Sequence, residues 1–80
     1  MTISNAVSIR LNELLREYCL TQYKLEQQTG ISHDTIKSIM KGKAKGVNLK
    51  TIIAIADGLN ISVSKFLDSP LFDYNNLDMD

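Results

Sequence analysis

A group of basic side chains is the first feature of this 80-residue chain that could do chemistry. Five lysines and no acidic residue lie between Lys37 and Lys50. A local cluster of ammonium groups favours phosphate binding more than the net charge does. That net charge is zero, because residues 1–67 hold all nine basic and five acidic side chains, and residues 68–80 hold four aspartates. The pattern predicts a local phosphate-binding surface.

Other kinds of chemistry have little support among the residue types. His33 and Cys19 are the only histidine and cysteine, and neither has a second such residue at metal-ligand spacing. The chain contains no nucleophile elbow and no phosphate-binding glycine loop. We therefore expect no metal, no cofactor and no enzymatic activity.

The chain also carries few signals of export. A single cysteine allows no intramolecular disulfide, which fits a reducing cytoplasm better than secretion. The first residues do not form a signal peptide, and no apolar stretch approaches the roughly 18 residues of a membrane span. We expect a cytoplasmic protein that does not interact with membranes.

Apolar periodicity and capping residues predict one all-α domain, a compact bundle of five short helices. The expected helices cover residues 5–18, 22–29, 33–40 or 41, 49–58 and 63–68. The expected N-caps of the last four are Thr21, Ser32, Asn48 and Ser62. Gly30 is expected to end the second helix. The fourth helix should bury Ile52, Ile53, Ile55 and Ala56.

The segment from Gln22 to Met40 is the most informative part of the sequence. It contains two short helices joined by a tight turn, with apolar residues where two steeply crossing helices would share a core. These residues are Leu25, Ile31, Ile36 and Ile39. In a helix-turn-helix unit the first helix fixes the angle of the second, which enters the major groove of double-stranded DNA. The segment predicts such a unit in helices two and three.

The sequence resembles the lambda-repressor-like, or Cro/CI (Xre), family over about residues 5–68. The matching elements are Leu20-Thr21-Gln22, Leu25, Gly30-Ile31-Ser32, Ile36, Ile39, Lys41-Gly42-Lys43, Leu59-Asn60-Ile61-Ser62-Val63 and Phe66-Leu67. The resemblance implies a five-helix domain whose third helix reads bases, in a bacterial or phage protein that regulates transcription.

The resemblance also implies DNA contacts position by position. The base-contact candidates are Ser32, His33, Asp34, Lys37 and Ser38. The phosphate-contact candidates are Gln22, Thr35, Lys41, Lys43, Lys45 and Asn48.

Several of these side chains have plainer alternatives. His33 and Ser38 could be ordinary exposed polar residues. Asp34 could accept a hydrogen bond from cytosine N4, or favour the positive end of the helix dipole. Lys37 could reach guanine or a phosphate. The loop lysines at 41, 43 and 45 could be solvated only.

Two departures from the family pattern concern packing. Glu26 stands where the family usually has a small residue, and its stem could run outward so that water solvates the carboxylate. Leu15 and Met40 stand where many members pair an arginine with a glutamate. An apolar pair can replace a buried ion pair without loss of stability.

We interpret residues 1–68 as a DNA-binding domain and residues 69–80 as an acidic tail. The tail, with Leu71, Phe72, Tyr74 and Leu77, could be flexible or contact a second protomer or a partner protein. We expect a sequence-specific transcriptional regulator, with repression favoured, acting as a homodimer on half-sites about 34 Å apart. The alternatives are a protein-interaction module on the same fold and an antitoxin that binds both a partner and DNA.

Overall fold

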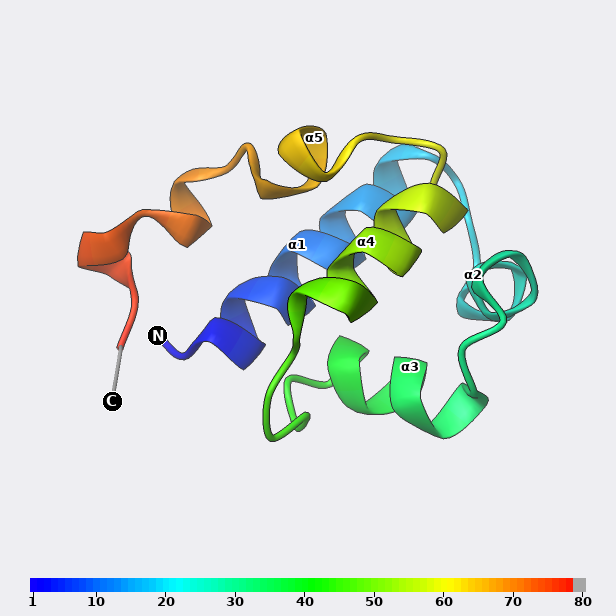
Figure 1. Cartoon of the computed structure of the whole chain (residues 1–80), viewed down its shortest axis with the longest axis horizontal. Coiled ribbons are helices and arrows are strands. Elements are labelled where there is room, and N and C mark those ends of the chain that lie inside the picture. Colours follow the sequence, from blue (N-terminus) through cyan, green and yellow to red (C-terminus); the bar gives the residue numbers. More distant parts are fainter. Residues whose placement is uncertain (79–80) are drawn as a thin grey trace.

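The computed structural model describes residues 1–78, which form five α-helices followed by two short 3₁₀ helices (Figure 1). The α-helices are α1 (Ile3–Glu17), α2 (Gln22–Thr29), α3 (His33–Met40), α4 (Leu49–Gly58) and α5 (Val63–Leu67). The 3₁₀ helices are η1 (Pro70–Phe72) and η2 (Tyr74–Asn76). The described part of the chain has no strand, and the all-α fold expected from the sequence is confirmed.

Each α-helix begins after a residue whose side chain accepts a hydrogen bond from a backbone N–H three positions on. The four predicted N-caps of α2 to α5 are confirmed. The prediction for the first helix was wrong by two residues at its start. Thr2 accepts from the backbone N–H of Asn5, so α1 begins at Ile3. The last α-helix ends at Leu67, one residue before the predicted end.

One continuous apolar core joins all five α-helices. Its largest fully buried side chains are Phe66, Leu11, Leu14, Leu25, Ile36 and Ile55. Leu15 is buried in the same core and Met40 packs against it, as expected for an apolar pair at these positions. Ile53 was wrongly predicted to be buried, because its side chain is 49% exposed. It lies about 100° around α4 from Ile52, outside the single face that α4 turns to the core.

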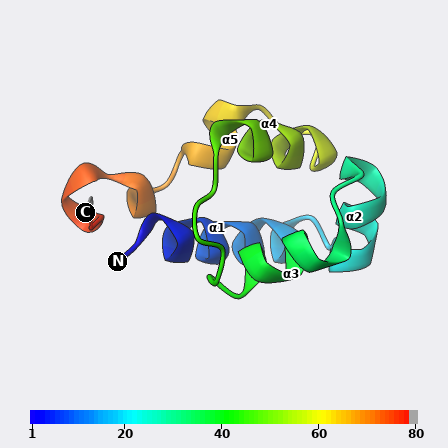
Figure 2. The ribbon, with the colours of Figure 1, turned by 60° about the horizontal axis from the view of Figure 1, so that its bottom comes forward.

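The contacts between helices hold α3 from two sides. α3 packs against both α1 and α2, while α4 packs against α2 and α5. Figure 2 shows α1 and α3 together on one side of the molecule, α4 and α5 on the other, and α2 at one end. Of the described helices, none is long and apolar enough to cross a membrane.

The segment after α5 returns to the beginning of the chain. η1 contacts α1, and the ring of Phe72 lies 6.3 Å from that of Phe66, centroid to centroid. The terminal ammonium of Met1 lies 3.3 Å from the side-chain carboxylate of Asp78. The backbone N–H of Asp78 also donates to the backbone carbonyl of Met1 at 2.8 Å. The two ends of the described chain therefore lie close together (Figure 1).

Candidate nucleic-acid interface

The turn between α2 and α3 fixes where α3 begins. Gly30 has a φ of +73°, and its N–H donates to Glu26 O at 2.9 Å. A glycine takes this left-handed conformation without the steric cost that a Cβ would bring. The backbone N–H of Ile31 donates to the Thr29 hydroxyl at 3.1 Å, and the Ser32 cap follows. Only residues 30–32 thus separate the end of α2 from the start of α3.

The other end of α3 is held by polar side chains of α1. The Ser8 hydroxyl and the Asn12 amide both donate to the backbone carbonyl of Met40, at 2.5 and 3.1 Å. The Ser4 hydroxyl donates to the carbonyl of Ala44 at 2.6 Å. These three residues recur every fourth position, so one stripe of α1 anchors the end of α3 and the loop after it. Their spacing was the available sequence signal, but they were not predicted as positioning residues.

The base-contact candidates lie at the start and along one side of α3. Ser32, His33, Asp34 and Lys37 are exposed, and Ser38 is half-buried. The Ser32 hydroxyl already accepts from the backbone N–H of Thr35 and donates to the Thr35 hydroxyl at 2.9 Å. Of these candidates, Asp34 and Lys37 therefore have the freest polar groups, whereas one ring nitrogen of His33 is engaged by Glu26.

A pocket of about 260 Å³ lies between α3 and the following loop. Its lining includes Asp34, Thr35 and Ser38 from α3 and Ala44 and Val47 from the loop. The pocket places part of the predicted reading surface next to the loop that carries the lysines. It is open to the exterior and has a mixed polar and apolar lining.

The phosphate-contact candidates flank α3. Lys41, Lys43 and Lys45 are exposed, and none forms an ion pair with another residue of the described range 1–78. Asn48 uses its Oδ1 to accept from the backbone N–H and hydroxyl of Thr51, at 2.8 and 2.9 Å. Its amide NH₂ is the group left to donate to a phosphate.

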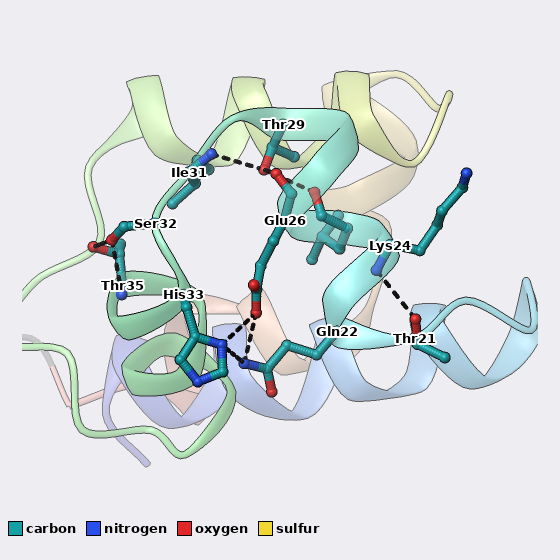
Figure 3. A network of polar contacts seen from close by, with 10 residues as sticks. Thr21, Gln22, Lys24, Glu26, Thr29, Ile31, Ser32, His33 and Thr35 are labelled. Atoms are coloured by element: carbon teal, nitrogen blue, oxygen red, sulfur yellow. Dashed lines mark hydrogen bonds and ion pairs between the residues drawn. The ribbon is translucent and has the colours of Figure 1, made fainter.

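Glu26 lies among these DNA-contact candidates, and its carboxylate does not take the outward, solvated arrangement that the sequence left open. Its Oε2 accepts from Gln22 Nε2 at 2.9 Å and lies 2.8 Å from His33 Nδ1 (Figure 3). The side chain of Glu26 is only 14% exposed, whereas that of His33 is 62% exposed. Two partners, Gln22 on its own helix and His33 on the next, hold the carboxylate inward. Glu26, which was not predicted to contact DNA, thus links Gln22 and His33, which were.

The environment of Glu26 favours its ionised form. Burial by itself would raise the pKa of the Glu26 carboxyl, but hydrogen bonds from Gln22 and His33, together with the charge of His33, lower that pKa below its ordinary value of 4.5. Glu26 is therefore a carboxylate near neutral pH, with both oxygens able only to accept. Among the described residues, no cluster of three or more potential ligands could hold a metal ion.

An exposed polar helix, anchored at both ends beside a lysine-bearing loop, is the arrangement of a helix-turn-helix DNA-binding domain. The chain belongs to the Cro/C1-type helix-turn-helix DNA-binding family, whose model matches residues 10–69. The predicted family membership is confirmed.

A curated relative extends this comparison. The chain is similar to the SPbeta prophage-derived uncharacterized HTH-type transcriptional regulator YotL of Bacillus subtilis (strain 168). The two are 32% identical over 59 residues, which cover 74% of each chain. The origin of YotL fits the expected bacterial or phage background. No solved structure matches the chain.

Proposed function

We propose that this protein is a sequence-specific transcriptional regulator that inserts α3 into the major groove of double-stranded DNA. The observation that carries the proposal is the anchoring of α3 at both ends while its polar side stays exposed. A reading helix must be held rigidly, because hydrogen bonds to bases depend on its position and angle. Membership of a DNA-binding family and similarity to a relative named as a transcriptional regulator support it.

The proposed contacts divide by chemistry. His33, Asp34 and Lys37, with Ser32 and Ser38 beside them, read base edges, which carry the sequence information. The phosphate contacts fall to Gln22, Thr35, Lys41, Lys43, Lys45 and Asn48. They fix the position and angle of α3 and carry no sequence information themselves.

The regulator acts as a homodimer in this proposal. One α3 reads only a few base pairs, so a second copy on an adjacent half-site is needed for specificity. Half-sites of such dimers lie about 34 Å apart, one turn of DNA. The longest extent of the molecule is 34 Å, a length comparable with this spacing. Occlusion of a promoter, and hence repression, is the simplest outcome of such binding.

Selection of bound duplexes from a random DNA pool, at near-physiological salt, tests the proposal. We expect an enriched inverted repeat with half-sites about one helical turn apart. His33→Ala in a parallel selection should relax the preference at one position of each half-site. A single enriched half-site would contradict the homodimer but keep the regulator. Absence of enrichment, with binding lost at modest salt, would leave only phosphate attraction and favour the protein-interaction module.

A further inference from the structure

One oxygen of Glu26 receives two donors from two helices. Oε2 accepts from Gln22 Nε2 at 2.9 Å, and His33 Nδ1 lies 2.8 Å from the same oxygen. An ionised carboxylate can only accept, so His33 Nδ1 must carry the hydrogen in this contact. Gln22 Nε2 and His33 Nδ1 lie 3.3 Å apart because both donate to the same oxygen, so this contact is not itself a hydrogen bond.

This contact settles the form of a neutral His33 ring. A neutral imidazole carries one ring hydrogen, and the hydrogen bond made by one nitrogen decides what the other presents. With the hydrogen on Nδ1, Nε2 presents a lone pair and acts as an acceptor. His33 is the first residue of α3 and its side chain is 62% exposed. Figure 3 shows that the far edge of the ring points away from Glu26 and Gln22.

We propose that Glu26 is a positioning residue that determines which bases His33 reads, by fixing Nε2 of the ring as an acceptor. This inference rests on the proposed function and deepens it. In the major groove, adenine N6 and cytosine N4 are the amino donors, whereas guanine O6 and N7, adenine N7 and thymine O4 are acceptors. His33 therefore selects adenine or cytosine on the strand that it faces.

Removal of Glu26 should abolish the exclusion of guanine and thymine. Gln22 Nε2 would lose its acceptor, and at 3.3 Å from His33 Nδ1 it is placed to donate there instead. The ring hydrogen would then move to Nε2, which would become a donor towards the groove. A Glu26→Ala protein should thus accept guanine and thymine as well as adenine at the same position, through guanine O6 and N7, thymine O4 and adenine N7, and should disfavour cytosine.

The first experiment reads the ring directly and needs no DNA. Nitrogen–proton NMR spectra of protein labelled with ¹⁵N at histidine distinguish the two neutral tautomers from the charged ring. The measurement is made at pH 8. We expect the hydrogen on Nδ1 in the wild type and in Gln22→Ala, and on Nε2 in Glu26→Ala. Circular dichroism checks that each variant is folded.

The second experiment measures affinity at pH 8 for four duplexes that differ only at the base pair that His33 contacts. That base pair is identified by the relaxed position in the His33→Ala selection. We expect the wild type to favour adenine or cytosine about tenfold, and Glu26→Ala to lose this preference. In a His33→Ala background, Glu26→Ala should leave the preference at that position unchanged, because Glu26 acts through the ring.

Two results would overturn the inference alone. One is a wild-type ring with its hydrogen on Nε2, or on both nitrogens, at pH 8. The other is the same base preference in wild type and Glu26→Ala while sequence-specific binding persists. If the wild-type protein shows no sequence preference at all, the proposed function is overturned together with the inference.

Discussion

Glu26 contacts both Gln22 and His33, two residues that the sequence indicated only as separate DNA contacts. Gln22 and Glu26 are four positions apart on α2, a spacing at which helical side chains meet. Glu26 and His33 are seven positions apart, and the turn at Gly30 lies between them. Their contact depends on the angle at which α2 and α3 cross, which periodicity does not encode. The sequence thus suggested two members of this cluster as DNA contacts but not the carboxylate between them.

The lowered pKa of Glu26 predicts an acid-dependent part of the protein's stability. A carboxyl whose pKa is lower in the folded state stabilises the fold above its unfolded value, here near 4.5. That stabilisation is lost as the pH falls through the lower folded value. We expect Glu26→Gln to reduce the free energy of unfolding near pH 6, with a difference from wild type that shrinks as the pH falls below about 4.5.

Urea unfolding of both proteins between about pH 3 and pH 6 measures this difference. Glu17→Gln is the matched control, because Glu17 is exposed at the end of α1. It should not reproduce the Glu26 profile. A Glu26→Gln difference that stays constant over this range would show that the carboxylate charge contributes nothing.

Lys43 offers a test of the phosphate contacts. Its side chain is exposed in the loop that Ser4 of α1 holds at Ala44. Each phosphate neutralised by a lysine releases condensed counterions, so affinity falls with salt in proportion to the number of such contacts. We expect Lys43→Ala to weaken binding to all sequences and to reduce the slope of log affinity against log salt by about one.

Fluorescence anisotropy across a salt series measures this slope. Lys65→Ala is the matched control, because Lys65 is exposed on α5, which lies away from α3 in Figure 2. An equal change of slope in both variants would mean that the lysines act through overall charge rather than at the interface.

At the scale of the elements, local signals were sufficient for most of the fold. The caps at Thr21, Ser32, Asn48 and Ser62 were predictable because capping depends on residues three positions apart. Two failures have local causes. Thr2 caps α1 ahead of its first buried residue, Ala6, and Ile53 lies on an apolar helix with only one face turned to the core. The anchoring of α3 by α1 joins residues more than 25 positions apart and needed the structure.

Gly42 lies where the end of α3 and the following loop come close to α1. Its φ is +71°, and a Cβ built there would lie 2.7 Å from Asn5 Oδ1. We expect Gly42→Ala to lower the free energy of unfolding by about 1–2 kcal/mol through left-handed strain alone. The loop with Lys43 would shift as well, so the fraction of Gly42→Ala protein that remains folded should also bind DNA more weakly than the wild type.

Gly46 provides a control in the same loop, since a Cβ there would meet nothing within 4 Å. Gly46→Ala should leave stability unchanged or raise it by up to about 1 kcal/mol. Thermal and urea unfolding of the two variants check the contrast. Equal effects at both positions would mean that the general flexibility of the loop matters and that the approach to α1 does not.

On the scale of the whole molecule, α1 is the element that ties the ends of the chain together. Arg10 donates from Nε to the carbonyl of Phe66 at 2.8 Å and from a terminal nitrogen to that of Lys65 at 2.7 Å. η1 then contacts α1, and the N-terminal ammonium meets Asp78. The division of the chain at residue 68, drawn from composition, stays a prediction that stability measurements can test.

Phe72 is the residue whose removal tests this division. It packs against the core and its ring lies 6.3 Å from that of the fully buried Phe66. Tyr74, two positions on, is 73% exposed. We expect Phe72→Ala to lower the free energy of unfolding by roughly 1–2 kcal/mol, less than the 3–5 kcal/mol typical of a fully buried phenylalanine. Tyr74→Ala should change it by less than about 0.5 kcal/mol.

Urea unfolding at low protein concentration measures the free energy of unfolding of both variants. Equal and negligible effects would mean that Phe72 adds nothing to the stability of the domain, and would support the boundary at residue 68. The expected contrast would instead place the tail within the domain, so that a partner protein could use Phe72 only by first detaching it from the core.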